Sequence, residues 1–299
     1  MVNYETKSDK MFGAVNVFLL AVILIVCAYP MWFVIIASVS DPNLVNSGEV
    51  LFLPKKFSWS GYQAVFKNSD IGTGYINTIL YTAFGTLLDI AVTIPAAYAL
   101  SRKDFVGRNA LMGVFMVTMF FSGGMIPGYL VVQRLHLLNT PWIMIIIGAA
   151  STYNIILCRT FFANSIPGEV QDAAEIDGCS NFQLFWKIVL PLSKPIIAVM
   201  VLFFAVSHWN NYFTAMMYIT KQELQPLQLI LRDILIQSDQ MTKMIDTQAV
   251  DPASLAEAER VKQLVRYSSI IVSSLPVMCL YPLVQKYFVK GIMIGSVKG

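Results

Sequence analysis

Charged side chains are scarce in this sequence of 299 residues. They make up 13% of the chain, against 56% hydrophobic residues, and the mean hydropathy is +0.62. A soluble domain normally carries about twice that share of charge. The net charge of +3 is also too small to favour a nucleic acid as a partner. This composition predicts a protein that lies largely within a membrane.

Metal-ligating and redox residues are equally sparse. There are two histidines and four cysteines, and the cysteines do not have the spacing of a zinc or redox motif. The sequence contains no G-x-x-x-x-G-K-[ST] phosphate loop, no H-E-x-x-H motif and no G-x-S-x-G motif. We therefore expect no metal site, no catalytic residue, no bound cofactor and no enzymatic activity in this chain.

Six apolar runs are long enough to cross a bilayer, which takes about 20 helical residues. The only acidic, basic or imidazole side chains inside them are Asp89 and His208. Backbone groups in hydrocarbon must be hydrogen-bonded internally, and runs of this length achieve that as helices. We therefore predict an all-α polytopic fold with six transmembrane helices, at roughly Phe12–Ser38, Tyr75–Leu100, Asn109–Val132, Asn139–Cys158, Pro195–Ile219 and Tyr267–Gln285.

The distribution of Lys and Arg predicts the side on which each loop lies. With six spans both termini share one side, and the segments on that side hold eleven of the 21 basic residues. Six of the other ten lie in the long 220–266 loop, and long loops cross the membrane largely regardless of charge. We therefore place both termini in the cytoplasm of a multi-pass protein of the plasma membrane. The predicted organisation is a cytoplasmic tail (1–11), a six-span domain (12–287) with a cytoplasmic loop (159–194) and an outer loop (220–266), and a second cytoplasmic tail (288–299).

The outer 220–266 loop carries two short amphipathic patterns. One covers Leu227–Ile236, and the other follows Pro252, with Ser254 and Glu257 at the spacing of a capping box. Neither is apolar enough to span a membrane. Two interpretations stay open: the helices cover the outer mouth as lids, or they form a docking surface for a soluble partner.

The cytoplasmic 159–194 loop contains the pattern of a short helix. Pro167 suits its first turn, and Gly178 is typical of the residue that ends it. Ala173 and Ala174 share a face of this helix, where their small side chains would let another surface approach closely. The carboxylates at the edge of that face suit basic partners.

A second short helix follows in the same loop. Ser180 and Gln183 form a capping box at its start. We expect it to run to Leu190 and to be broken by Pro191, because the proline ring clashes in a helix interior. Pro195 then opens the fifth span.

The two helices together carry a family motif. The sequence DAAEIDG, followed after nine residues by IVLP, resembles the EAA loop of binding-protein-dependent ABC importer permeases, with Asp172 in place of the usual glutamate. The resemblance implies the type I ABC importer permease fold. It also implies that the first helix docks on a separate ATPase. The residues that match the motif, and would carry this coupling, are Asp172, Ala173, Ala174, Asp177, Gly178 and Pro191.

The resemblance extends over nearly the whole chain. It is closest to the carbohydrate branch, and within it to the polysaccharide-type subgroup of Gram-positive bacteria. It implies import of an oligosaccharide or polysaccharide fragment together with a second homologous permease, an extracytoplasmic solute-binding protein and an ATPase dimer that binds ATP and Mg²⁺. The stretches that support it are Asn77-Thr78, Ala96–Arg102, Phe121–Pro127, Asn154–Ile156, Trp209-Asn210 and Lys290–Gly299.

An ion-coupled secondary transporter is the alternative interpretation. It would use Asp89 as a proton or cation site, because intramembrane acids are functional candidates by default. The sequence shows no inverted repeat and no further membrane carboxylate to relay charge. We therefore expect Asp89 to be structural, either neutral or hydrogen-bonded to a neighbouring helix.

A path for sugars needs amides and aromatic rings, because hydroxyl-rich ligands bind through hydrogen bonds and flat apolar faces. The candidates are Asn154 on the fourth span and His208, Asn210 and Tyr212 on the fifth. Such amides can equally tie membrane helices together. On a continuous helix, adjacent residues point about 100° apart. We therefore expect Asn210 to face the sugar and Asn211 to bond the partner permease.

Overall fold

The structure is a computed structural model that describes residues 6–67, 69–247, 259–260, 262–280 and 282. All regular secondary structure in these residues is helical, and no strand occurs among them, as the all-α prediction requires. The chain divides into two compact units, Met1–Ser69 with Leu231–Ser274 and Asp70–Ile230 with Leu275–Gly299.

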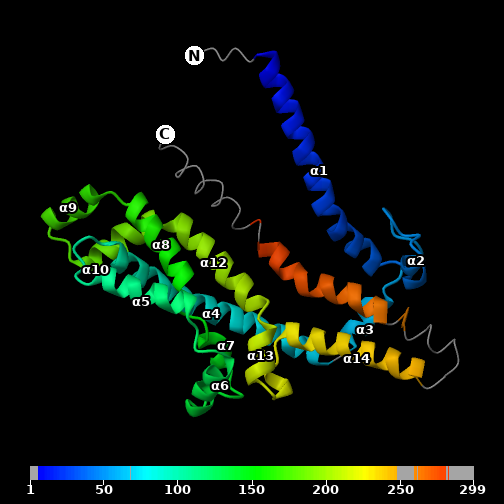
Figure 1. Cartoon of the computed structure of the whole chain (residues 1–299). Helices are drawn as coiled ribbons and strands as arrows, with labels where there is room; N and C mark the ends of the chain where they lie inside the picture. The colour runs from blue at the N-terminus through cyan, green and yellow to red at the C-terminus, as the bar shows by residue number, and fades with distance from the viewer. Residues whose placement is uncertain (1–5, 68, 248–258, 261, 281, 283–299) are drawn as a thin grey trace. The chain divides into compact units, whose positions relative to one another are not determined.

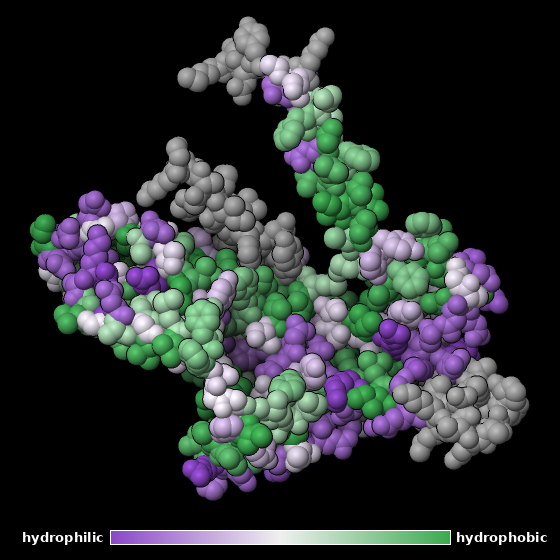
Figure 2. Space-filling model, viewed as in Figure 1, coloured by the Kyte–Doolittle hydropathy of each residue, from purple (hydrophilic) through white to green (hydrophobic). Residues whose placement is uncertain are grey.

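The first unit opens with a long apolar helix, α1 (Lys7–Ser38; Figure 1). A capping box starts it: the Thr6 hydroxyl accepts the Asp9 N–H, and the Asp9 carboxylate accepts the Thr6 N–H. The helix therefore begins inside the tail predicted for residues 1–11. Only 6% of its most apolar window is buried, so the hydrophobic surface that Figure 2 shows along it needs lipid or another subunit beside it.

The rest of the first unit consists of α2 (Pro42–Asn46), α3 (Ser60–Phe66), the part of α14 (Leu227–Thr247) that follows Ile230, and the helix Lys262–Leu280 as far as Ser274. A glycine lets α3 approach this last helix closely. A Cβ at Gly61 would lie 2.8 Å from the Leu264 carbonyl oxygen. The end of α1 joins α3 through the Ser38 and Tyr62 hydroxyls, which lie 2.9 Å apart.

The second unit is built around α4 (Asp70–Ser101). It packs against α8 (Thr152–Ser165), α12 (Lys194–Trp209) and α7 (Trp142–Ile146), and α5 (Arg108–Phe120) packs on α8 (Figure 1). Apolar side chains fill the space between these helices. The large members of this core include Ile94, Ile155, Phe162, Leu184 and Met200.

The two ends of this second unit carry different elements. One end carries α9 (Gly168–Ile176), α10 (Asn181–Leu184), a π-helical turn (Phe185–Val189) and α11 (Leu190–Leu192), and Figure 2 shows hydrophilic side chains gathered there. The other end carries α6 (Met125–Arg134), α13 (Tyr212–Tyr218), the 3-10 turn Gln222–Leu224 and the start of α14.

The six predicted spans are only partly continuous. Within the described residues, three helices are long and apolar enough to cross a membrane: Ser8–Ser38, Asp70–Ser101 and Lys262–Leu280. Two further spans are possible if each of two bent helix pairs counts as one. These pairs are Arg108–Phe120 with Met125–Arg134, bent by 112°, and Asn181–Leu192 with Lys194–Trp209, bent by 78°.

The third and fourth predicted spans are wrong as continuous helices, and a glycine with a positive φ lies at each of these two breaks. The third span is broken between α5 and α6, where Gly124 has a φ of +87°. The fourth is divided into α7 and α8, with Gly148 at a φ of +89° between them. A residue in this conformation leaves the helical path, and glycine adopts it without steric cost.

The 220–266 loop also differs from its prediction. The helix expected at Leu227–Ile236 continues to Thr247. The second amphipathic pattern, with Ser254 and Glu257, lies outside the described residues. So does the tail predicted for 288–299.

Candidate functional site

The first helix of the 159–194 loop forms close to where the sequence predicts it. In α9, Pro167 is the N-cap residue and Asp177 the C-cap. Gly178 follows in the left-handed conformation, with a φ of +71°, and ends the helix. The role of Gly178 in stopping the helix is therefore confirmed, whereas Pro167 lies just before the first turn, which begins at Gly168.

The side chains of α9 divide into an exposed face and a buried edge. Asp172, Ala173 and Asp177 are exposed. Ala174 is only 3% exposed and belongs to the core of the same chain, together with Phe162 and residues of the following helix. The expectation that both alanines face a partner is therefore wrong for Ala174, because its own chain already covers it.

The same face carries an apolar residue that sequence reasoning missed. Ile176 is 87% exposed at the end of α9, between the exposed Glu175 and Asp177. An isolated exposed isoleucine is ordinary on a protein surface, but one surrounded by acids on a helix with a motif match is a candidate contact. Ile176 lies inside the DAAEIDG sequence, and this position in the motif could have marked it as a candidate contact residue.

Arg102 joins α9 to the end of α4. Its guanidinium donates two hydrogen bonds to the Asp104 carboxylate, at 2.8 and 2.7 Å, and one to Asn181 Oδ1 at 3.1 Å. It also reaches the Tyr98 hydroxyl at 3.3 Å and lies 3.5 Å from the Glu175 carboxylate. A planar guanidinium can hold several acceptors at once, which an ammonium cannot do in the same geometry.

This pairing shifts the pKa of both groups in the direction that favours their charged forms. The hydrogen bond to Asp104 raises the pKa of the Arg102 guanidinium above its ordinary value. The same bond lowers the pKa of the Asp104 carboxyl. Both groups are therefore charged throughout the physiological pH range, and the link does not depend on a proton. Sequence reasoning named Arg102 only for its charge and its place in a motif.

Other basic residues lie beside Arg102. A hollow of about 640 Å³ between the 101–108 turn, the end of α8 and α9 is lined by Lys103, Arg108 and Arg159 as well. The Arg159 guanidinium donates to the Leu100 carbonyl at 3.1 Å. The acids Asp172 and Glu175 line the opposite side. The result is a mixed-charge surface at the α9 end of the unit.

The second helix of the loop starts as predicted but does not end as predicted. Ser180 and Gln183 form the expected capping box. Pro191, however, lies within α11, and the helix bends only at Ser193, by 78°. The π-helical turn Phe185–Val189 precedes the proline and changes the hydrogen-bond pattern from i–4 to i–5. The expected break at Pro191 is therefore wrong, because this turn accommodates the missing N–H.

The fifth predicted span is broken where its polar residues stand. Helix α12 ends at Trp209, and α13 begins at Tyr212. Asn210 is exposed, and its amide donates to the Val206 carbonyl at 3.0 Å. Asn211 caps α13, because its Oδ1 accepts the Thr214 N–H at 3.2 Å. The continuous helix that was used to orient the two amides is therefore wrong at this point.

The remaining path candidates do not form one cluster with Asn210. Tyr212 is 42% exposed in the first turn of α13, beside the break. His208 is 7% exposed and lies 2.9 Å from Asp89 Oδ2, so its ring faces α4. Asn154 is half-buried in the first turn of α8. The expected hydrogen bond from Asp89 to a neighbouring helix is thus present, with His208 as the partner.

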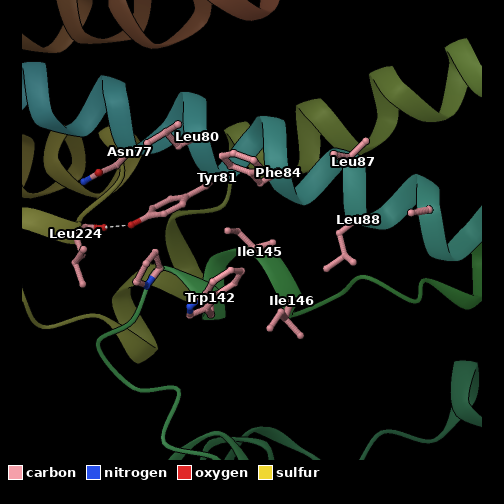
Figure 3. Close-up of a pocket in the computed structure, with 12 residues that line it drawn as sticks. Asn77, Leu80, Tyr81, Phe84, Leu87, Leu88, Trp142, Ile145, Ile146 and Leu224 are labelled. Atoms are coloured by element: carbon pink, nitrogen blue, oxygen red, sulfur yellow. Dashed lines mark hydrogen bonds between the residues drawn. The ribbon is translucent and has the colours of Figure 1, made fainter.

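An apolar groove of about 790 Å³ lies between α4 and α7 in the same unit (Figure 3). Leu80, Phe84 and Leu87 line it from α4, and Trp142 and Ile146 from α7. None of the predicted path residues lines it. The Asn77 amide and the Tyr81 hydroxyl, which also line it, already have hydrogen-bond partners in the chain.

At the left end of the groove in Figure 3, α4 is bonded to the 3-10 turn. The Asn77 amide donates to the Glu223 and Gln225 carbonyls, and the Tyr81 hydroxyl donates to the Leu224 carbonyl. The groove therefore suits apolar groups rather than a sugar.

Comparison with known proteins gives consistent matches over the whole chain. The family model described as binding-protein-dependent transport system inner membrane component matches residues 71–293. Protein LplC of Bacillus subtilis (strain 168) is 36% identical over 298 residues, which cover 99% of this chain and 98% of that protein. The polygalacturonan/rhamnogalacturonan transport system permease protein YtcP of the same strain is 37% identical over 291 residues, covering 97% and 99%.

A solved structure agrees with these sequence matches. It is the crystal structure of a bacterial ABC transporter involved in the import of the acidic polysaccharide alginate. One of its chains matches with a TM-score of 0.79 and 34% identity, covering 96% of this chain and 100% of that chain. The predicted ABC importer permease fold is confirmed, and the ion-coupled alternative is not supported. The protein therefore belongs to the family of binding-protein-dependent transport system inner membrane components.

Proposed function

We propose that this chain is a membrane permease subunit of an ATP-driven importer for an oligosaccharide or polysaccharide fragment. The observation that carries the proposal is the full-length similarity to YtcP and to the chain of the alginate importer, both named for polysaccharide transport. ATP and Mg²⁺ would bind to a separate ATPase dimer. A second homologous permease and an extracytoplasmic solute-binding protein complete the assembly.

Both termini lie in the cytoplasm in this proposal. Lys and Arg are enriched on the cytoplasmic side of membrane proteins. The basic residues Arg102, Lys103, Arg108 and Arg159 lie together at the α9 end of the second unit, which supports this orientation. Helix α9 then faces the ATPase, and the break between α12 and α13 lies toward the opposite side.

The ATPase contact would be made by the exposed face of α9. Asp172, Ala173 and Asp177 present two carboxylates around a small side chain. The exposed Ile176 adds an apolar group at the helix end. An apolar anchor with a charged rim is a common form of protein interface. Ala174 would support this face from inside the chain, whereas Pro191 is exposed on α11, outside α9.

The proposed function is tested by uptake in proteoliposomes that contain the complete complex. A panel of neutral and acidic oligosaccharides is supplied with the solute-binding protein, with ATP or with an ion gradient alone. We expect uptake of at least one glycan that requires ATP. Uptake driven by an ion gradient without ATP would instead support the secondary transporter.

Asn210→Ala is expected to change sugar recognition. The amide is exposed at the helix break, and the loss of one hydrogen bond to a sugar corresponds to about a tenfold rise in KM for uptake. The number of ATP molecules hydrolysed per sugar imported should stay unchanged. The measurement is the KM for each glycan of the panel.

Asn211→Ala is the matched control for this variant. It removes the cap of α13, which costs about 1 kcal/mol of stability, and leaves Asn210 in place. We expect lower thermal stability with the same order of sugar preference. A larger change of preference in Asn211→Ala than in Asn210→Ala would contradict the assignment of Asn210 to the sugar path.

A further inference from the structure

Asp89 of α4 and His208 of α12 form a buried pair inside the membrane-spanning part of the second unit. Nε2 of the imidazole lies 2.9 Å from Oδ2 of the carboxylate, and the two residues are 7% and 3% exposed. Oδ1 of Asp89 has no hydrogen-bond partner among the described residues. A polar pair at this depth is costly to insert, so its contribution must be sought in what it holds in place.

The ring of His208 is placed by shape as well as by its hydrogen bond. Gly85 lies one turn before Asp89 on the same face of α4. A Cβ at this position would come 2.5 Å from Nε2 of the imidazole, far closer than any van der Waals contact. The missing side chain of Gly85 is therefore the space that the ring fills. Two independent features of α4 thus fix the position of His208.

His208 is also bonded to the break in the helix. It is the last but one residue of α12, and its carbonyl accepts the N–H of Asn211 at 3.2 Å. The next residue, Trp209, packs on Tyr75 of α4, with ring centroids 6.3 Å apart. The turn that separates α12 from α13 is therefore held to α4 through two consecutive side chains.

The geometry points to Asp89 and His208 as positioning residues for the break between α12 and α13. Through the break they set where Asn210 and Tyr212 stand. This inference rests on the proposed function only in so far as those two residues contact the sugar. Neither Asp89 nor His208 needs to touch the substrate or to carry a charge across the membrane.

The test displaces the imidazole by two unrelated changes. Gly85→Ala fills its space without altering either partner, and Asp89→Leu removes its acceptor. Asp89→Asn keeps an oxygen at the same place and serves as the conservative variant. Gly72→Ala is the matched control, because the same substitution on the same helix meets nothing within 4 Å.

The position of the break is read out by maleimide labelling of Phe213→Cys, an exposed residue in the first turn of α13. Labelling is followed by mass spectrometry of that peptide in the complete complex, so that the native cysteines do not interfere. Loss of a buried hydrogen bond corresponds to about a tenfold change in the equilibrium between two positions. We expect a change of that size in the labelling rate for Gly85→Ala and Asp89→Leu. Gly72→Ala and Asp89→Asn should label like the parent.

Parental labelling of Gly85→Ala in a complex that still assembles would overturn the inference, whatever Asp89→Leu does. The KM for uptake, measured on the same variants without the added cysteine, separates this inference from the proposed function. Altered labelling with an unchanged KM would support the positioning role and contradict the assignment of Asn210 and Tyr212 to the sugar path. Altered labelling with a raised KM would support both.

Discussion

Ala173→Trp and Ala174→Trp are expected to stop uptake for different reasons. Ala173 is exposed on α9, so the chain itself has room for an indole there. The ring would stand between α9 and the ATPase, and we expect uptake to fall by about two orders of magnitude, as for a disrupted interface hot spot. The permease should keep its level in the membrane and its thermal stability but no longer co-purify with the ATPase.

Ala174→Trp places the same ring inside the chain. Ala174 is 3% exposed and lies in the core with Phe162, Ile166 and Leu184. Overpacking a core by even a few methylenes costs about 1–3 kcal/mol, and an indole is much larger. We therefore expect a lower melting temperature of the purified permease and a low level in the membrane. Parental uptake by Ala173→Trp would end the docking proposal, and parental stability of Ala174→Trp would contradict the burial.

Arg102→Met is expected to uncouple ATP hydrolysis from uptake. The guanidinium is the link by which the end of α4 is bonded to Asn181 and Glu175 of the α9–α10 segment. Without it, movement of α9 by the ATPase reaches α4 through apolar packing alone. Hydrogen bonds to a charged group contribute about 1.5–3 kcal/mol each when well formed. We expect ATP hydrolysis to continue while the sugar imported per ATP falls about tenfold or more.

Two further variants serve as controls for Arg102→Met. Lys103→Met removes a neighbouring positive charge from the same hollow and should leave coupling unchanged. Arg102→Lys keeps the charge but loses the planar fork, so it should be intermediate. Equal effects of Arg102→Met and Lys103→Met would show that only the net charge of the turn matters.

The Asp104 carboxylate, which accepts two hydrogen bonds from the Arg102 guanidinium, determines how Arg102 is held as the pH changes. The folded pKa of Asp104 is depressed below its ordinary value of 3.8, so the stabilisation is present above that value and is lost as the pH falls through the lower, folded one. Coupling that depends on Arg102 should therefore be constant between about pH 5 and 8. A loss of coupling within that window would require a different titrating group.

The elements that the sequence predicted well are those with local signals. The end of α9 at Gly178 and the capping box of Ser180 and Gln183 depend on residues within a few positions of each other. Long apolar runs likewise predicted α1 and α4. In each case the chemistry that decides the structure is contained in a single short stretch of chain.

The features that the sequence did not predict depend on distant parts of the chain. Ala174 is buried because Phe162 and Leu184 lie against it, and nothing in the α9 sequence shows that contact. Arg102 meets Asn181, which is 79 residues further along. The break at Asn210 occurs within an apolar run, where hydropathy alone favours a continuous helix. These are consequences of packing rather than of local propensity.

The bond between Asp89 and His208 also has a consequence for how the protein is made. The two residues are 119 positions apart in the chain. At a synthesis rate of about 5–20 residues per second, His208 leaves the ribosome about 6–24 s after Asp89. During that interval the Asp89 carboxylate in the middle of α4 lacks its hydrogen-bond partner. Helix α1 has an acid only in its first turn, so it can insert on its own. We therefore expect α1 to enter the bilayer first, and α4 to remain beside the insertion machinery until α12 arrives.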